Sequence, residues 1–227
     1  MKEPRIAQEI IRAYRFVSIP NVSDAMDRLG IAGHPRGILQ TWTGCPRLVG
    51  TAATMKLVTT DVSKESPVIG TLRAIMAGHP GYVLVIDFDN NKTVNTMGGV
   101  AGATAVQYGL TGCVADGLVR DIDEYKTLGL PVYARGPIQT SIRGRCGFAG
   151  HGIDVQLDGV KVRDGDLVVG DENGLLVIPT EAIRDVLELA QKLKGIEDSV
   201  IAAVRRGEDP VEAHEKVRYD AMTSAKA

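Results

Sequence analysis

A glycine-rich loop offers the first candidate chemistry, the binding of a carboxylate or a phosphate. Residues 95–102 read NTMGGVAG and lead into a helical pattern. Successive backbone N–H groups at a glycine-rich helix start bind anions, because they point outward together at the positive end of the helix dipole. The glycines lack the G-x-G-x-x-G spacing of a dinucleotide site. Close packing of the helix on a sheet would explain them equally well, so both interpretations stay open at this point.

A second loop, residues 116–124, reads DGLVRDIDE and places an arginine beside an aspartate. The guanidinium of Arg120 could hold a substrate carboxylate through two parallel hydrogen bonds. The carboxylate of Asp121 could bind a hard divalent ion that keeps open positions for substrate and water. The structural alternative is that Asp121 caps a helix while Arg120 pairs with a surface acid. The helix dipole would likewise account for Asp123 and Glu124 in a first helical turn.

The elements that must position these two loops alternate regularly. They are predicted strands over 82–87, 112–115 and 131–134, and predicted helices from the glycine-rich stretch to Gly109 and over 121–128. Such alternation with short links is typical of parallel βαβ units. Ligands of parallel sheets bind outside the carboxyl ends of the strands. The sequence therefore predicts that both loops lie at one edge of one sheet.

The segments before this alternating region indicate helices and one long strand. We expect helices over 4–16 and 23–29, the second capped by Ser23 and stopped by Gly30, an irregular loop over 31–47, a strand over 48–60, and a helix from Ser66-Pro67 to Ala77. Proline suits the first helical position, where a missing N–H costs nothing, so Pro67 marks a helix start.

After residue 150 the pattern changes to antiparallel hairpins and a long helix. Asp158-Gly159 separates strands over 154–157 and 160–162, as a two-residue type I′ turn requires. A second hairpin pairs 167–169 with 175–178, and a helix follows over 180–206, with Thr180 as its N-cap and Gly195 as a weak point. Parallel units followed by hairpins predict a single α/β domain. The βαβ units are too few for a doubly wound nucleotide-binding fold.

Composition excludes several classes of protein. The 227 residues are 44% hydrophobic and 24% charged, with a net charge of -2, which argues against a nucleic-acid partner. No apolar run approaches the roughly 18 residues of a membrane span, and no apolar signal region is present near the start. The three cysteines form no C-x-x-C pair and the four histidines no H-E-x-x-H motif, so we expect buried, reduced thiols and no histidine zinc site. We therefore expect a cytoplasmic protein.

Seven segments in this order resemble one known family. They are VSDAMDRLG, LVGTAATMKL, GYVLVID, the glycine loop, GCVADGLVRD, LGLPVYARG and GDLVVGDENGLLVIP. Twenty residues separate Gly99 from Arg120-Asp121, and two further residues separate Asp121 from the acid Glu124. The chain resembles the RraA-like family, which contains metal-dependent class II pyruvate aldolases of the 4-hydroxy-4-methyl-2-oxoglutarate aldolase type and proteins named for the regulator of ribonuclease E activity.

The resemblance implies a fold and roles for particular residues. The implied fold is a three-layer β/β/α swivelling domain spanning residues 1–227, assembled as trimers or pairs of trimers. Asp121 matches the metal ligand, with Mg²⁺ or Mn²⁺ as the ion, and Arg120 matches the arginine that grips the carboxylate and 2-oxo end of the substrate. The loop whose backbone amides receive that carboxylate corresponds to Gly98, Gly99, Val100 and Ala101.

The chain departs from the aldolase pattern at one position and matches it loosely at another. Many aldolases carry an acid where this chain has Gly99, which removes one candidate for proton handling. Glu124 fits the acid position of the signature, either in catalysis or in holding Arg120. Glu197 is the nearest match to a glutamate that aldolases supply from a neighbouring subunit. We therefore expect the helical extension over 181–227 to pack on a neighbour, against the alternative that it packs wholly on its own sheet.

The implied activity is that of a lyase acting on a 2-oxo acid. It would cleave a substrate like 4-hydroxy-4-methyl-2-oxoglutarate to pyruvate and a second oxo acid, with a metal-bound water as the expected base and oxaloacetate decarboxylation as a side activity. A non-catalytic binding protein like the ribonuclease regulator is one alternative. A sugar-acid dehydratase or isomerase using the same metal site is another.

Overall fold

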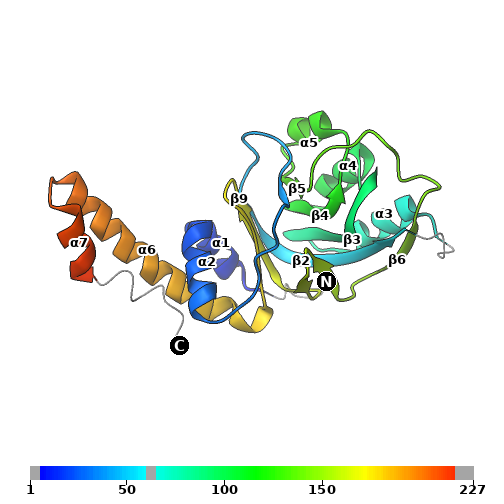
Figure 1. Cartoon of the computed structure of the whole chain (residues 1–227). Helices are drawn as coiled ribbons and strands as arrows, with labels where there is room; N and C mark the ends of the chain where they lie inside the picture. The colour runs from blue at the N-terminus through cyan, green and yellow to red at the C-terminus, as the bar shows by residue number, and fades with distance from the viewer. Residues whose placement is uncertain (1–5, 60–64, 218–227) are drawn as a thin grey trace.

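The computed structural model describes residues 6–59 and 65–217, and a mixed sheet forms its centre (Figure 1). Hydrogen-bonded neighbours follow the order β1-β5-β4-β3-β2-β9-β10, with β6 also paired to β2 and with β7 and β8 in a separate ribbon. The strands are β1 (Leu39–Gln40), β2 (Leu48–Val58), β3 (Tyr82–Asn95), β4 (Gly112–Leu118), β5 (Val132–Ala134), β6 (Gly147–His151), β7 (Val155–Leu157), β8 (Val160–Val162), β9 (Leu167–Asp171) and β10 (Gly174–Ile178).

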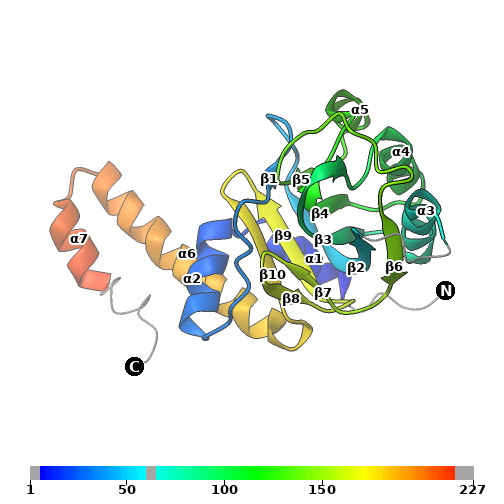
Figure 2. The ribbon, with the colours of Figure 1, turned by 45° about the vertical axis from the view of Figure 1, so that its right-hand side comes forward.

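Helices lie against two regions of this sheet. They are α1 (Gln8–Tyr14), α2 (Ile19–Arg28), α3 (Pro67–Ala77), α4 (Gly99–Gln107), α5 (Ile122–Leu128), α6 (Ile183–Arg205) and α7 (Pro210–Val217), with a short 3₁₀ turn over Thr180–Ala182. Helices α3, α4 and α5 cover one face of the parallel strands, while α1, α2 and α6 pack near β9 and β10 (Figures 1 and 2).

Successive side chains of the central strands point alternately into two separate hydrophobic cores. Leu84 and Ile86 of β3 point into the core beneath α3, α4 and α5, whereas Val83 and Val85 point into a core shared with β7 and β8. This alternation is the period of a strand that is buried on both faces. The result is a three-layer β/β/α arrangement, which confirms the predicted fold class.

The parallel units and hairpins occur where the local patterns predict them. Strands β2, β3, β4 and β5 run parallel, and β9 and β10 pair antiparallel. Asp158 and Gly159 both have positive φ angles, 49° and 78°, as a type I′ turn requires. Gly30 and Gly109 also have positive φ and follow the ends of α2 and α4, as expected for helix stops.

The predicted N-caps are wrong at two helices. Helix α2 starts at Ile19 rather than after Ser23, because Ser18 accepts a hydrogen bond from Asn21 N and a proline follows in the first turn. Thr180 is not an N-cap, since its hydroxyl donates to Gly165 O at 3.0 Å and the chain first forms a 3₁₀ turn. Ser66 precedes α3 as predicted but makes no side-chain capping bond.

Some element lengths also differ from expectation. The first helix is confined to Gln8–Tyr14, and the expected Pro4 start lies outside the described residues. Strand β3 continues past residue 87 to Asn95, because its register with β4 shifts twice while pairing continues at Asn91 with Gly117 and at Asn95 with Leu118. Helix α6 passes through Gly195 without a break.

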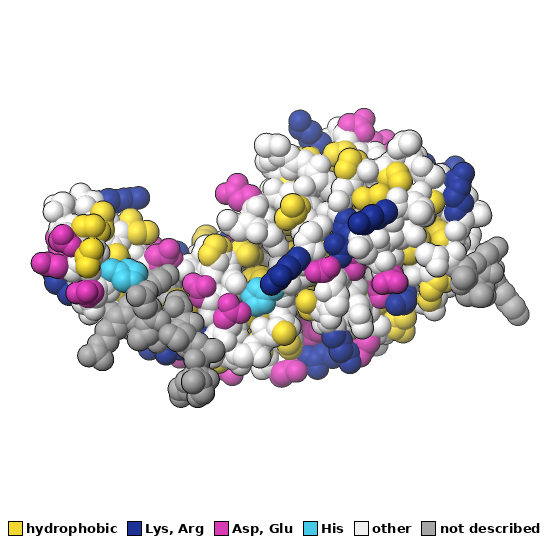
Figure 3. All heavy atoms as spheres, in the orientation of Figure 1, with side chains coloured by type: hydrophobic (Ala, Val, Ile, Leu, Met, Phe, Trp, Pro, Cys, Tyr) yellow, Lys and Arg dark blue, Asp and Glu magenta, His cyan; other side chains and the backbone are white. Residues whose placement is uncertain are grey.

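The second half of α6 forms an arm with α7. The first half is buried through Val186, Ala190 and Leu193, but beyond Gly195 the helix extends away from the body and α7 turns back beside it (Figures 1 and 2). Val204 and Val211 on this arm are 41% and 63% exposed. Figure 3 shows hydrophobic side chains at this end of the molecule, bordered by acidic ones.

The three cysteines are buried, as the sequence predicts. Cys45, Cys113 and Cys146 are free and buried. Burial raises the pKa of the Cys113 thiol to about 12, so this side chain is an inert core residue at neutral pH. Among the described residues, no helix combines the length and the apolar character that crossing a bilayer requires.

Candidate functional site

The two candidate loops meet beside each other at the carboxyl ends of β3 and β4. Thr96 N donates to Leu118 O at 2.7 Å, and Arg120 N donates to Met97 O at 3.3 Å. These bonds extend the β3–β4 pairing into the loops. The structure thus brings Gly98, Gly99, Arg120 and Asp121 into one cleft, as the strand topology predicts.

Asp121 precedes α5 but does not cap it with its side chain. Its backbone has φ 61° and ψ 45°, the left-handed conformation that aspartate tolerates better than most residues. The carboxylate turns away from its own helix, and Oδ2 accepts a hydrogen bond of 2.7 Å from Gly99 N. The capping alternative is therefore wrong, and Asp121 links the two loops.

Arg120 lies beside this aspartate with unused hydrogen-bonding capacity. Its Nε is 3.5 Å from Asp121 Oδ2, and its side chain is 30% exposed. The Nε atom is buried and has no hydrogen-bond partner within the described residues. A buried donor without a partner costs free energy. A ligand with oxygen acceptors in the cleft would remove that cost.

Glu124 occupies the space that a side chain at position 99 would need. A Cβ added to Gly99 would lie 1.7 Å from Glu124 Oε2 and 2.6 Å from its Cδ. The glutamate thus places a carboxylate where an acid on residue 99 would begin. Within the described ranges no ion pair joins Glu124 to Arg120. No contact therefore supports the role of Glu124 in holding the arginine.

Further residues complete the cleft, and those of α3 and of a later loop lie outside the sequence patterns. They are Val68, Thr71 and Leu72 of α3, Asn95 at the end of β3 with Thr96 and Met97 after it, and Ser141, Ile142 and Arg143 of the later loop. Asn95 is buried, and its side chain holds that loop by accepting from Ile142 N at 2.8 Å. The later loop lacks any periodic pattern or motif, so no sequence signal could place it here.

The carboxylates of the cleft suit one kind of metal ion. Asp121 lines the cleft and Glu124 lies at its edge against Gly99, and no cluster of three or more His, Cys, Asp or Glu side chains able to hold a metal occurs in the described part of the chain. Zinc sites usually need three or four such protein ligands. Magnesium is commonly held by one or two carboxylates and keeps several waters. The residues present therefore fit Mg²⁺ or Mn²⁺ rather than Zn²⁺.

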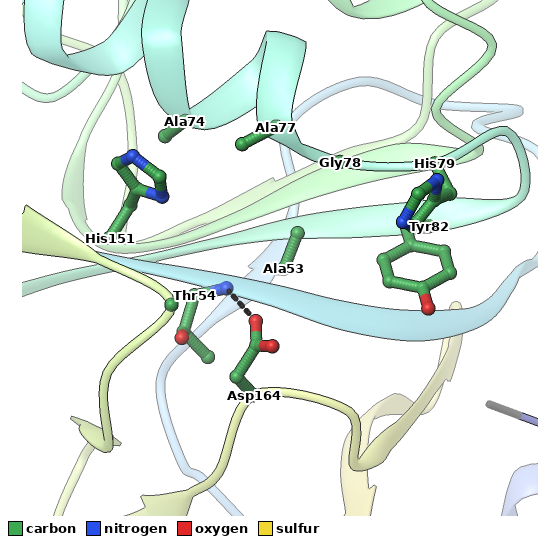
Figure 4. A pocket seen from close by; sticks show the side chains of 10 residues that line it. Ala53, Thr54, Ala74, Ala77, Gly78, His79, Tyr82, His151 and Asp164 are labelled. Carbon is green, nitrogen blue, oxygen red and sulfur yellow. Dashed lines mark hydrogen bonds between the residues drawn. The ribbon is translucent and has the colours of Figure 1, made fainter. Parts of the chain in front are cut away.

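A second cavity lies on the other side of α3 and contains none of the predicted site residues. It measures about 230 Å³ and is lined by Ala53, Thr54, Ala74, Ala77, Gly78, His79, Tyr82, His151, Gly152 and Asp164. Figure 4 shows His79 and His151 at opposite ends, above a floor of small side chains. Asp164 accepts a hydrogen bond from Thr54 N at 3.2 Å, so this carboxylate anchors backbone. The cavity offers no guanidinium for an acidic ligand.

Glu197 does not join Asp121 within one chain. It lies on α6, where its Oε2 accepts a hydrogen bond of 2.7 Å from Asn21 Nδ2 of α2. Helices α2 and α6 stand on the opposite side of the molecule from α5 (Figures 1 and 2). Burial, then the charges of Asp27 and Glu197, raise the pKa of the nearby Asp24 carboxyl.

Comparison with known proteins identifies relatives over most of the chain. A family model described as RraA-like, Aldolase/RraA, matches residues 19–177. A protein of Halalkalibacterium halodurans, named as a candidate 4-hydroxy-4-methyl-2-oxoglutarate aldolase, is 29% identical over 184 residues, which are 81% of this chain and 83% of that protein.

Solved structures share the fold. A Pseudomonas syringae protein superposes with a TM-score of 0.82 at 27% identity, covering 92% of this chain and 98% of the other. RraAS2 of Streptomyces coelicolor, described as an unusual member of the RNase ES inhibitor RraA family, superposes with a TM-score of 0.79 at 22% identity, covering 88% and 98%. At that identity the second match concerns the fold alone.

Proposed function

The chain belongs to the RraA-like family, and we propose that it is a divalent-metal-dependent lyase that releases pyruvate from a 4-hydroxy-2-oxo acid such as 4-hydroxy-4-methyl-2-oxoglutarate. The observation that carries the proposal is the conformation of Asp121, which turns its carboxylate away from its own helix and toward the glycine loop. A left-handed backbone at a non-glycine residue costs free energy and persists only where the surrounding structure enforces it, and such residues cluster at functional sites. The conformation of Asp121 places an acid 3.5 Å from the Nε of Arg120, a buried atom without a hydrogen-bond partner in the described residues, at the ligand-binding edge of the sheet.

Asp121 would hold the ion, Mg²⁺ or Mn²⁺. When bound, the ion would supply positive charge next to the carboxylate and keto oxygens of the substrate, which lowers the cost of negative charge developing there. The Gly99 N–H keeps one carboxylate oxygen of Asp121 in place at 2.7 Å. The other carboxylate oxygen of Asp121 has no hydrogen bond within the described residues, so it is available to the ion.

The substrate carboxylate would be bound by the chain itself. The guanidinium of Arg120 has the fork geometry that matches two carboxylate oxygens, and its Nε is a buried donor without a partner. First-turn N–H groups of a helix have no intrahelical acceptor, so those of Val100 and Ala101 in α4 are available to the same anion.

Glu124 is the side chain of the cleft that suits proton transfer from the C4 hydroxyl. It is exposed, and its Oε2 lies 1.7 Å from the position that a Cβ on Gly99 would take. A carboxylate there can accept a proton from the hydroxyl, directly or through a water, as the C3–C4 bond breaks. Gly99 leaves that position free for it.

The proposal is tested by measuring pyruvate release by the purified protein. We expect pyruvate from 4-hydroxy-4-methyl-2-oxoglutarate, and more slowly from oxaloacetate, with Mg²⁺ or Mn²⁺ present. A chelator should stop the reaction and added ion should restore it. If neither substrate yields pyruvate with either ion, the lyase function is wrong and a binding role like that of the regulator proteins is favoured.

Gly99 and Glu124 should behave as a coupled pair. Gly99→Ala forces the Glu124 carboxylate from its place, because the new Cβ would meet Oε2 at 1.7 Å. We expect this change to lower kcat/KM about as much as Glu124→Ala does, and the double variant to be little worse than either, a coupling of about 1–2 kcal/mol. Stability should change little, since an exposed carboxylate can rotate away.

Gly195→Ala is the matched control for this cycle. Nothing lies within 4 Å of a Cβ added to Gly195 in the middle of α6. This variant should keep full activity and gain about 0.5–1 kcal/mol in unfolding free energy, because alanine is the better helix former. Independent, additive losses from Gly99→Ala and Glu124→Ala would show that the two residues do not share a role.

We further propose that a neighbouring subunit supplies Glu197 to this cleft in a trimer or hexamer. Two apolar surfaces of the chain support a head-to-tail contact between copies. One is the arm, with Ile201, Val204 and Val211 exposed, and the other is the α3–α4 face beside the cleft, with Ile69, Met76, Val100 and Val106 exposed. A head-to-tail contact that closes on itself forms a ring.

Complementation between inactive subunits tests this arrangement. Mixed oligomers of Asp121→Asn and Glu197→Ala should regain part of the activity, because some of their clefts contain both native residues. Glu188→Ala, at an exposed position of the same helix, is the control and should remain fully active by itself. A monomer in solution, or mixtures that stay inactive, would contradict the contribution from a neighbour.

A further inference from the structure

We propose that Arg143 binds a second acidic group at the far end of the substrate and so selects dicarboxylic over monocarboxylic 2-oxo acids. The inference rests on the proposed function, because it concerns the same cleft. It starts from the loop over residues 139–146, which lines the cleft with Ser141, Ile142 and Arg143.

This loop is held rigidly against the end of β3. Asn95 N donates to Thr140 O at 2.9 Å, and Asn95 Oδ1 accepts from Ile142 N at 2.8 Å. Asn95 is buried, and these two hydrogen bonds, one from its backbone N–H and one to its side-chain oxygen, fix the position of the loop. The side chain that follows Ile142 is therefore carried by an ordered segment at the rim of the cleft.

Two arginines of the loop are used differently. Arg145 Nη1 donates to Ser141 O at 2.7 Å, so this guanidinium stabilises the turn itself. Arg143 lines the cleft, and within the described ranges its guanidinium has no hydrogen bond or ion pair. The structure of the loop thus accounts for Arg145 but not for Arg143.

The charges and surfaces of the cleft match a ligand that is acidic at both ends. Its lining contains two guanidinium groups, Arg120 and Arg143, and one carboxylate, Asp121, even before a divalent ion is added. Val68, Leu72, Met97 and Ile142 supply apolar surface to the same lining. Arg120 would receive the carboxylate next to the keto group, which leaves Arg143 for the carboxylate at the other end.

Paired ligands that differ in one group test the proposal by binding alone. 2-Oxoglutarate and 2-oxopentanoate have the same chain length and cannot be cleaved, since neither has a C4 hydroxyl. Titration calorimetry with Mg²⁺ present should show tighter binding of 2-oxoglutarate to the wild type. In Arg143→Gln the ratio of the two affinities should fall about tenfold, as expected for the loss of one charge-assisted pair.

The preference for the dicarboxylic acid should also appear in turnover. For 4-hydroxy-2-oxoglutarate against 4-hydroxy-2-oxopentanoate, Arg143→Gln should lower the ratio of kcat/KM values by about the same factor. Arg143→Lys should recover part of it, because an ammonium keeps the charge without the fork. Arg184→Gln, at an exposed position of α6, is the charge-matched control and should leave both ratios unchanged.

Each outcome separates this inference from the function on which it rests. Unchanged ratios in Arg143→Gln overturn the role of Arg143 even if the wild type releases pyruvate. A variant that dissociates the oligomer and weakens both ligands equally also overturns it, and would place Arg143 against an acid of a neighbouring copy. Absence of pyruvate from both 4-hydroxy substrates contradicts the lyase function, while the binding ratio still tests the arginine.

Discussion

At a Mg²⁺ concentration that saturates the wild type, an Asp121→Asn variant should release pyruvate at least about a thousandfold more slowly. This factor corresponds to about 4 kcal/mol of lost transition-state stabilisation. The amide removes the negative charge that would hold the ion. Asparagine tolerates the left-handed backbone at φ 61°, and its carbonyl can still accept from Gly99 N, so the loops should stay joined. The measurement is steady-state turnover across a range of Mg²⁺ concentrations.

Asp123→Asn is the matched control for this prediction. Asp123 is an exposed acid in the first turn of the same helix and loses the same charge when replaced. It should keep turnover within about twofold, since exposed charges near helix starts contribute only a few tenths to about 1 kcal/mol of stability. Equal loss in both variants, or a normal rate in Asp121→Asn, would remove Asp121 from the metal site.

Replacing Arg120 should give the second large loss. Arg120→Ala removes the guanidinium expected to hold the substrate carboxylate, and truncation of one partner of a desolvated charge pair costs about 2–5 kcal/mol. We expect kcat/KM to fall by the corresponding factor, roughly thirtyfold to several thousandfold. Arg120→Lys should recover little, because a single ammonium cannot reproduce a two-bond fork.

The exposed Arg184 on α6 provides the comparison for this arginine. Arg184→Ala should leave kcat/KM unchanged, which excludes a general effect of lowering the positive charge of the protein. Oxalate affinity in the Arg120 variants separates binding from folding, since it should fall with the loss of the guanidinium while the unfolding temperature stays near that of the wild type. Near-normal kcat/KM in Arg120→Ala would place the substrate carboxylate elsewhere.

The fold was predictable where its signals are local. The Asp158-Gly159 turn and the strand–helix alternation from residue 82 onward each depend on neighbours within a few residues. One N-cap prediction failed because the partner of the expected cap lies far along the chain, and the other because a nearby serine competes with the expected one. Thr180 bonds to Gly165 across the chain, and Ser18 takes the cap that Ser23 was expected to provide.

The candidate site was predictable only in part for a related reason. Arg120, Asp121 and the glycine loop follow neighbouring parallel strands, and that topology alone brings them together. The approach of Glu124 to Gly99 depends on how α4 and α5 pack, which no spacing in the sequence reveals. Arg143 reaches the cleft because the side chain of the buried Asn95 accepts a hydrogen bond from Ile142 N and so holds the loop of Arg143 in place. The pattern of residue types in the sequence does not predict that bond.

Calorimetric titration of oxalate tests the central claim most directly. Oxalate resembles the carboxylate and adjacent oxygen of the pyruvate product in its enolate form, and it undergoes no reaction. The account predicts binding with Mg²⁺ present, none after chelation, and none in Asp121→Asn at any ion concentration used. Equal binding of oxalate with and without the ion, or undiminished binding in Asp121→Asn, would contradict a metal-assisted 2-oxo acid site at Asp121.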